Sequence, residues 1–410
     1  MKLDNAMRKI PAWAVIVCGL AIIFTAAFLT ALVGMDYPAH EEIVKSLDLS
    51  SPAKLFKEHM EPIWHLMTYG VMHLLRCRVE IAAGLVSGFL YTLLFVIAFL
   101  TLRKAVPGIP ASAHALGALV LHLCGAIYLP WFNEEPYLGQ GSPNVWHNPT
   151  TIAVKPLALL FFVLLGSVLV SSQESNFEKK QPVWKYILLA VLLLLTNLAK
   201  PSFVQIYYPA IFVLMIIWLI MYQRKNLSLA IALFITCIPS LALTITQFVL
   251  SFYSDNKGAS GVRFAPFEVA GQFTRSIFGS FLLAAAFPVV MLILDAVRRK
   301  IDWDTVLAWL MLAMGFAERL LLAESGERAS HGNFSWGYLL GLYLVWYCAM
   351  RSLLRRAFPN SIAGAAGGAE DTAGGRFDFG LLLSVIILVL HLISGMYYVF
   401  IYMIVQGHGL

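Results

Sequence analysis

The sequence predicts an all-α, polytopic membrane bundle with about eleven transmembrane helices, and three observations lead to that prediction. Of the 410 residues, 60% are hydrophobic and only 13% are charged, and the mean hydropathy is +0.77. Soluble domains carry about 25% charged residues. Apolar runs of about 20 residues, enough to cross the hydrocarbon core, recur along the whole chain. Residues 1–410 are therefore expected to form a single membrane-embedded domain.

Eleven apolar runs are predicted as spanning helices, within a range of ten to twelve. The first follows a basic start and is longer than the apolar core of a signal peptide, about 7 to 15 residues, so we expect it to remain as a spanning helix. The runs cover residues 12 to 34, 79 to 102, 111 to 131, 150 to 171, 184 to 199, 203 to 222, 227 to 252, 277 to 297, 304 to 323, 336 to 354 and 379 to 404.

The segment EPIWHLMTYGVMHLLRCR, residues 61 to 78, is apolar on one face but short for a span and rich in histidine. If it lies flat on the outer surface and the N-terminus is cytoplasmic, most Lys and Arg residues fall in short cytoplasmic loops, as the positive-inside rule requires. If it spans, those basic loops move outside. We therefore predict an interfacial helix within a first outer loop, residues 35 to 78. Residues 357 to 378, rich in Gly and Ala, are expected to be a flexible cytoplasmic linker.

Charge and cysteine content exclude two classes of protein. The net charge of +6 is explained by the topological use of Lys and Arg, so we expect a lipid bilayer and no nucleic acid as partner. The five cysteines, at positions 18, 77, 124, 237 and 348, have the spacing of neither a disulfide framework nor a metal site.

The first outer loop begins with GMDYPAHEEI, residues 34 to 43, directly after the first apolar run. Asp36 is expected to be partly desolvated there and held at a fixed depth, which suits a general base. Asp36, His40 and Glu41 offer donors for a divalent ion, and this remains an alternative. Because no HExxH or CxxC spacing accompanies them, no metal or other cofactor is predicted.

Two lysines are expected near helix starts on the outer face. In HNPTTIAVKP, Lys155 lies about one turn inside a predicted helix start, and in NLAKPSFVQ, Lys200 precedes Pro201 at another. Free backbone NH groups and a partial positive charge at a helix N-terminus attract phosphate, and an adjacent lysine adds a full charge. The alternative is a pair of lysines that snorkel to the surface beside prolines tolerated at helix entrances.

A fourth outer segment, AESGERASHGNFSWGY, covers residues 323 to 338. Its glycines allow the backbone to approach a ligand closely, and Trp336 and Tyr338 offer faces on which a sugar ring can stack. The same aromatic residues also suit an interfacial belt. The residues predicted to bind the sugar or the acceptor are His147, His331, Asn333, Trp336 and Tyr338.

Residues 12 to 104 combine a spanning helix, the DYPAHEE segment, the EPIWH segment, and a helix that ends in Arg103 and Lys104. This order resembles the N-terminal module of the GT-C superfamily of integral-membrane glycosyltransferases, which includes protein O-mannosyltransferases and lipid A aminoarabinose transferases. Asp36 matches the acidic position of that module, and residues 62 to 75 match its interfacial helix. The resemblance covers about a quarter of the chain. A second Asp-Glu pair and a large C-terminal soluble domain, found in some relatives, do not appear.

The resemblance implies a GT-C-like fold and inverting transfer of a sugar from a polyprenyl-phosphate or polyprenyl-diphosphate donor. The acceptor would be a hydroxyl of a glycan, lipid or protein at the outer face of the cell membrane. Asp36 would act as general base, with His40 and Glu41 orienting it or the acceptor. The residues that would hold the donor phosphate are Lys155, Lys200, Arg328 and Arg263.

Three other functions remain open from the sequence. A surface-polysaccharide polymerase would use the same chemistry on larger substrates. A membrane O-acyltransferase would rely on a histidine at a defined depth, with His391 and His122 as candidates. A transporter or lipid flippase would be expected to show internal repeats and polar residues at the bilayer centre, and neither feature is evident in the sequence.

Overall fold

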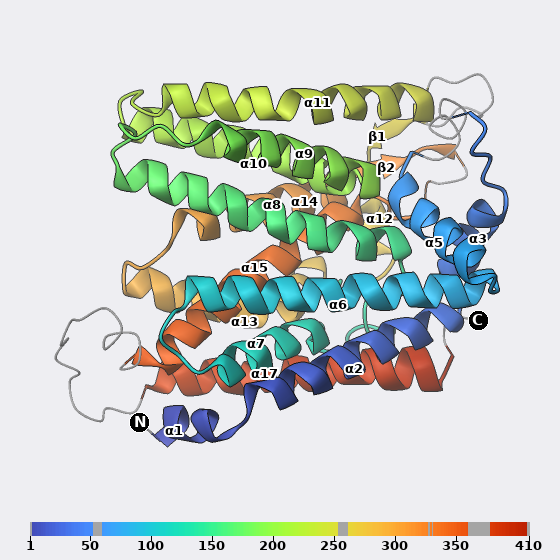
Figure 1. Ribbon diagram of the computed structural model, residues 1–410, viewed down its shortest axis with the longest axis horizontal. Helices are drawn as coiled ribbons and strands as arrows, with labels where there is room; N and C mark the ends of the chain where they lie inside the picture. The colour runs from blue at the N-terminus through green and yellow to red at the C-terminus, as the bar shows by residue number, and fades with distance from the viewer. Residues whose placement is uncertain are drawn as a thin grey trace.

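The computed structural model describes residues 2–51, 60–252, 261–326, 329, 331–359 and 378–407. Within these ranges the chain forms an antiparallel bundle of helices (Figure 1). A helix lies at each of the eleven runs that the sequence predicts as spans. These helices are α2 (Ala12–Leu32), α6 (Val79–Ala105), α7 (Ala111–Leu123), α8 (Pro149–Glu174), α9 (Val183–Ala199), α10 (Ser202–Met221), α11 (Leu227–Phe252), α13 (Ile277–Val297), α14 (Trp303–Leu321), α15 (Ser335–Ala357) and α17 (Phe379–Met396), which continues as the π-helix η2 (Tyr397–Val405).

Eight of the described helices are long and apolar enough to cross a membrane. They are α2, α6, α8, α10, α11, α13, α15 and α17 with η2, whereas α7 and α9 are shorter apolar helices. Helix α14 carries Asp304, Glu318 and Arg319 within its 19 residues. The prediction of a polytopic helical membrane bundle is confirmed at this level, and the number of helices that cross the bilayer stays a prediction.

The shorter helices within the described ranges include α1 (Lys2–Lys9), α3 (Tyr37–Lys45), α5 (Pro62–Leu75) and α12 (Glu268–Gly271). Helices α3 and α5 lie together at the end of the bundle where α2 finishes and α6 starts, here called the α5 end (Figure 1). Helix α5 starts with proline at its first position and stops at Arg76, whose φ of 50° is left-handed. It does not cross the bundle but forms a short helix at one end of it, and its predicted position at the membrane interface stays a prediction.

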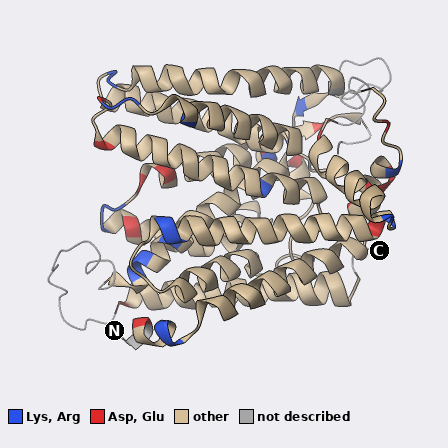
Figure 2. Cartoon of the chain, viewed as in Figure 1, with Lys and Arg blue, Asp and Glu red and all other residues tan. Residues whose placement is uncertain are grey.

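The other end of the bundle, here called the N-terminal end, carries α1 and many of the Lys and Arg side chains (Figure 2). There Arg351 of α15 donates from Nη2 to Asp304 Oδ1 of α14 over 2.8 Å, and both side chains are largely buried. Arg355 forms a second ion pair with Asp302 at 2.6 Å. Residues 360–377, most of the predicted linker, lie outside the described residues.

The predicted span over residues 111 to 131 is too long, because α7 ends at Leu123 and the chain continues in an extended form. Gly125 packs against Gly395 of α17, where a Cβ atom on either glycine would meet backbone atoms of the opposite segment. Asn144 Nδ2 donates to the carbonyl oxygens of Leu121 (2.7 Å) and Cys124 (2.8 Å) at the helix end. Cys124 and Ala126 are buried within the bundle, whereas Trp131 is exposed, and hydropathy alone cannot separate such a buried segment from a helix in lipid.

The all-α prediction missed a small antiparallel sheet at the α5 end. Strand β1 (Val262–Phe264) pairs with β2 (Leu322–Glu324), with Arg263 opposite Ala323. The first two residues of β2 fall inside the run predicted as a span over residues 304 to 323. A strand of three residues is too short to produce a readable alternation of apolar and polar residues.

Glycines bring the helices that carry the site into close contact. In α14, a Cβ atom on Gly315 would lie 2.5 Å from the backbone nitrogen of Tyr338 in α15. In α15, a Cβ atom on Gly341 would lie 2.8 Å from Leu312 Cα. Small residues allow this approach between membrane helices. The first turn of α15, with Trp336, is thereby held at the α5 end beside the starts of α8 and α10.

Candidate functional site

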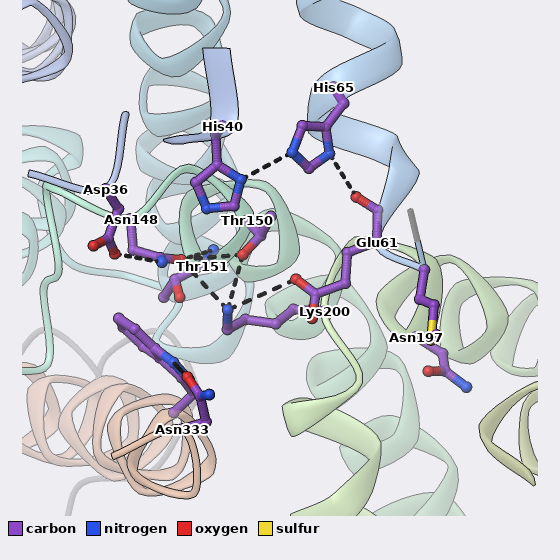
Figure 3. A network of polar contacts seen from close by, with 12 residues as sticks. Asp36, His40, Glu61, His65, Asn148, Thr150, Thr151, Asn197, Lys200 and Asn333 are labelled. Carbon is purple, nitrogen blue, oxygen red and sulfur yellow. Dashed lines mark hydrogen bonds and ion pairs between the residues drawn. The ribbon is translucent and has the colours of Figure 1, made fainter. Parts of the chain in front are cut away.

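Asp36 occupies the turn between α2 and α3. Gly34 and Met35 form the turn with positive φ angles of 103° and 61°, and α3 begins at Tyr37. An aspartate before a helix commonly caps it, but the Asp36 side chain makes no capping hydrogen bond here. Instead its Oδ2 accepts a hydrogen bond from Asn148 Nδ2 over 2.7 Å (Figure 3).

Asn148 connects Asp36 to the start of α8. Its Oδ1 accepts from Thr151 N (2.9 Å), which caps the helix, and from Thr150 Oγ1 (3.1 Å). It also lies 3.4 Å from Lys200 Nζ, which donates to it. Because the Oδ1 atom receives these donors, the NH₂ group must face the carboxylate of Asp36.

Lys200 lies between α9 and α10, and only 5% of its surface is exposed. Its Nζ donates to Thr150 Oγ1 (2.8 Å) and lies 3.8 Å from Glu61 Oε2. The same Nζ lies 4.5 Å from the centre of the Trp336 ring. A buried ammonium requires compensation of this kind. Asp36, Glu61, Asn148, Thr150 and Lys200 are called the Asn148 network below.

His40 lies one turn after Asp36 on α3 and contacts a second histidine. His40 Nδ1 and His65 Nε2 are 2.9 Å apart, and His65 Nδ1 lies 2.9 Å from the backbone oxygen of Glu61 (Figure 3). Burial, with smaller effects of the neighbouring His65 and Lys200 in the same direction, lowers the pKa of His40 to about 3. His40 is therefore neutral at pH 7.

Glu41 was predicted to share the role of His40, but it faces a different part of the molecule. The side chain is buried, and burial raises its pKa, with Glu80 at the start of α6 as the next cause. Consecutive helical residues point about 100° apart, so His40 and Glu41 cannot both face Asn148. Within the described residues, no hydrogen bond joins Glu41 to the Asn148 network.

The two predicted phosphate-binding lysines occupy different environments. Lys155 lies about two turns into α8 and is fully buried. Its Nζ donates to the carbonyl oxygen of Pro143 (2.7 Å) and lies over the rings of Tyr343 (4.9 Å) and Tyr91 (5.7 Å). Lys200 alone of this pair belongs to the network that contains Asp36.

Of the two predicted phosphate-binding arginines, Arg263 makes no contact with that network in the described part of the chain. Arg263 lies on β1, partly exposed, and forms a two-bonded ion pair with Glu268 at 2.5 and 2.6 Å. Arg328 lies outside the described residues.

Three of the residues predicted to bind sugar or acceptor lie near Lys200. The Trp336 indole donates to Asn333 Oδ1 (3.4 Å), and Asn333 Nδ2 donates to Glu324 Oε2 (2.6 Å). The ring of His147 lies 6.3 Å from that of Trp336, and its Nδ1 is 2.8 Å from the hydroxyl of Tyr398. Burial lowers the pKa of His147 to about 4, Asp36 acts in the opposite direction and Lys200 adds to the lowering.

The proposed stacking role of Tyr338 is not supported, because its ring is fully enclosed. Its hydroxyl donates to Gln140 O (3.0 Å), and Arg319 lies over the ring at 4.9 Å. Residues two apart on a helix face different sides, so Trp336 and Tyr338 cannot flank one ligand. His331 is exposed at the surface.

Sequence reasoning did not assign Glu61, His65, Asn148 or Thr150 to the site. Asn148 and Thr150 were recognised only as signals of a helix start, and Glu61 and His65 only as part of the interfacial helix. The relevant signal in both segments is a polar side chain at the first turn of a helix that starts at the α5 end.

The two histidines considered for acyl transfer lie inside the bundle. His391 Nδ1 is 2.7 Å from the oxygen of Gly125, and its Nε2 accepts from Phe287 N (3.4 Å). His122 Nδ1 is 2.7 Å from Ala118 O, and within the described residues its buried Nε2 has no hydrogen-bond partner.

Among residues that the structure describes, no group of three or more His, Cys, Asp or Glu side chains is arranged to hold a metal ion. Comparison with models of known protein families and with curated proteins finds no match. The chemistry of the Asn148 network is therefore the basis for inferring what this chain does.

Proposed function

We propose that this chain is a membrane glycosyltransferase that transfers a sugar from a polyprenyl-phosphate or polyprenyl-diphosphate donor to an acceptor hydroxyl. One observation supports this most directly: the carboxylate of Asp36 and the ammonium of Lys200 flank a single amide, that of Asn148. Glycosyl transfer from a lipid phosphate needs a base for the incoming hydroxyl and a cation for the departing phosphate. The network supplies one of each.

In this proposal, Asp36 takes the proton of the acceptor hydroxyl as that oxygen attacks the anomeric carbon with inversion. Asn148 binds Oδ2 of Asp36, and within the described residues no hydrogen bond occupies Oδ1. A bound carboxylate with one open oxygen is oriented for proton transfer.

Lys200 would hold the phosphate that leaves with the lipid. Helix α10 begins two residues later, at Ser202, and its free NH groups add attraction for an anion. Trp336, which lies over Lys200 Nζ, would present its other surfaces to the sugar. A donor anchored by an isoprenoid chain suits a site at the end of long apolar helices, since its lipid stays in the bilayer. In this proposal the α5 end is the outer face of the cell membrane, and the acceptor is a glycan, lipid or protein.

The test measures transfer of radiolabelled sugar from a panel of polyprenyl-phosphate and polyprenyl-diphosphate donors by the purified protein in lipid. Removing a general base costs about 100-fold to 10,000-fold in rate, so Asp36→Asn is expected to lose activity to that extent while retaining its thermal stability. Glu42→Gln is the matched control, because Glu42 lies on α3, is exposed and pairs with Lys45 at 2.7 Å.

Full activity of Asp36→Asn would remove Asp36 from the role of base. Failure of the wild type to transfer or hydrolyse any donor would contradict the proposed function as a whole.

A further inference from the structure

A chain of two hydrogen bonds determines which ring nitrogens carry protons: His40 contacts His65, and His65 contacts the backbone oxygen of Glu61. A carbonyl oxygen only accepts, so His65 Nδ1 must be the donor in their 2.9 Å contact. His65 is only 3% exposed, and burial favours its neutral ring, in which Nε2 then carries the lone pair. This Nε2 lies 2.9 Å from His40 Nδ1, so His40 Nδ1 donates to it. Neutral His40 is left with an unprotonated Nε2.

The pair of rings is enclosed and held in place. His65 is only 3% exposed, and the ring centres of His40 and His65 are 5.0 Å apart. Trp64 packs edge-on against both rings, at 6.1 Å from His40 and 5.5 Å from His65. Its indole donates to Ser87 Oγ of α6 over 3.2 Å, which ties α5 to the bundle. A half-turn of either ring would break the hydrogen bonds of its nitrogens.

The free nitrogen of His40 faces the Asn148 network. In Figure 3 the second nitrogen of the His40 ring lies on the side of Asp36 and Asn148, opposite His65. The positive charge of Lys200 also contributes to lowering the pKa of His40. An ionised carboxylate and an unprotonated imidazole nitrogen both accept hydrogen bonds and cannot donate them. Asp36 and His40 lie one helical turn apart, so these two acceptors match a ligand with two neighbouring donors.

We propose that His65 is a positioning residue that fixes the tautomer of His40, so that His40 Nε2 and Asp36 together recognise two neighbouring hydroxyls of the acceptor. This inference rests on the proposed function and narrows it. One hydroxyl gives its proton to Asp36 during transfer, and the next donates a hydrogen bond to His40 Nε2. Neighbouring hydroxyls are typical of a carbohydrate, whereas the side chains of Ser and Thr carry one. The acceptor is accordingly a glycan or glycolipid.

Glu61 also links this pair to the donor side of the site. Its backbone oxygen accepts a hydrogen bond from His65 Nδ1, while its carboxylate lies 3.8 Å from Lys200 Nζ. Because His65 contacts the backbone of Glu61 and Lys200 contacts its carboxylate, a change at His65 is expected to affect the acceptor first, with the donor contacts at Lys200 retained.

The first experiment is NMR of the full-length protein in lipid nanodiscs with ¹⁵N-labelled histidine, using His40→Ala to assign the His40 signals. Nitrogen shifts distinguish a protonated from an unprotonated ring nitrogen. We expect protonated Nδ1 and unprotonated Nε2 for His40 in the wild type. We expect the same in His65→Gln, whose amide oxygen can accept from His40 Nδ1, and a mixture of tautomers in His65→Phe. Protonated Nε2 in the wild type, or identical spectra in all three proteins, would overturn the inference.

The second experiment compares transfer to methyl hexopyranosides with transfer to a blocked serine amide. The wild type is expected to prefer the pyranosides, His65→Gln to keep most of that preference, and His65→Phe to lose it with an unchanged KM for the donor. Equal or better use of the serine amide by the wild type would contradict the inference. His73→Phe is the control on the same helix, since His73 is exposed and packs on Tyr69 at 4.2 Å.

The two experiments separate failure of this inference from failure of the proposed function. A wild type that transfers no sugar from any donor rejects the proposed function, whereas the NMR result reports the tautomer of His40 without any turnover.

Discussion

Asn148 combines two roles that substitution can separate. Its Oδ1 caps α8 through Thr151 N, and its Nδ2 binds the carboxylate of Asp36. Serine is also a favourable N-cap residue but lacks the NH₂ donor. The single side chain thus connects the stability of a helix to the orientation of the proposed base.

We expect Asn148→Ser to retain the stability of α8 within about 1 kcal/mol, because the cap is preserved, and to reduce kcat because Asp36 is no longer oriented. Asn148→Asp also preserves the cap but sets a second carboxylate beside Asp36, so its loss of activity should be the greater. Thermal unfolding and sugar transfer measured on the same preparations check both effects. Equal activity of Asn148→Ser and wild type would show that Asp36 does not depend on this contact.

One buried and one half-buried histidine at the site, His147 and His40, predict how stability depends on pH. The pKa of His40 is lowered to about 3 and that of His147 to about 4, mainly by burial. The unfolded chain takes up protons below a pKa of about 6.5, whereas the folded chain does not until these lower values are reached. The free energy of unfolding must therefore fall as pH drops from about 6.5 towards 4, by at most about 1.4 kcal/mol per pH unit for each histidine.

The measurement is thermal unfolding of the purified protein between pH 7 and pH 5, compared with His147→Gln. Removal of one of the two groups should give the variant a shallower dependence on pH. Parallel curves for the two proteins would contradict the assignment of His147 as a buried neutral group.

At the scale of elements, the contact between α14 and α15 depends on two glycines. A Cβ atom on Gly315 or Gly341 would meet the backbone of the facing helix, at 2.5 and 2.8 Å. Backbone atoms cannot move aside as the end of a flexible side chain can. The position of Trp336, in the first turn of α15, therefore depends on residues that make no contact with a substrate.

We expect Gly341→Ala to destabilise the protein by about 1 to 3 kcal/mol, since the added methyl group overpacks the contact. Gly70→Ala is the matched control: Gly70 lies on α5 with nothing within 4 Å of its would-be Cβ, so alanine should stabilise by up to about 1 kcal/mol. Thermal unfolding midpoints of the two variants should move in opposite directions. An unchanged midpoint for Gly341→Ala would show that the two helices can separate without cost.

At the scale of the whole molecule, the helices bring the Asn148 network and many of the basic turns to opposite ends of the bundle (Figure 2). The positive-inside rule then predicts that the N-terminal end is cytoplasmic and that the α5 end faces outward. Cys77, half-buried between α5 and α6, marks the α5 end. Lys180, exposed between α8 and α9, marks the other.

In intact cells, a membrane-impermeant maleimide is expected to label Cys77, and Cys77→Ser should abolish this labelling. A cysteine introduced by Lys180→Cys in that background should react only after the membrane is permeabilised. If the cysteine at position 180 were labelled in intact cells and Cys77 were not, the orientation would be the opposite of the predicted one. The network would then lie at the cytoplasmic surface.

The sequence by itself determined the class of the protein, the approximate ranges of its helices and the position of Asp36 at a helix junction. These features depend on short stretches of chain. Hydropathy over about 20 residues marks a helix in lipid, and Asn, Pro and Thr mark a helix start within one turn. A short helix near residues 62 to 75 that does not cross the bundle was also predictable, because charge bias in the loops favoured one of two topologies.

The tertiary structure alone decided which of these polar residues share a site. Asp36 binds Asn148, which is 112 residues away in the sequence, and Lys200 forms an ion pair with Glu61. No local sequence pattern encodes either contact. Rotation of each helix within the bundle decides whether a side chain faces the network or the core, as Trp336 and Tyr338 demonstrate. Lys155 and Lys200, alike in sequence context, separate because only Lys200 lies at the helix start where α3, α5 and α8 converge.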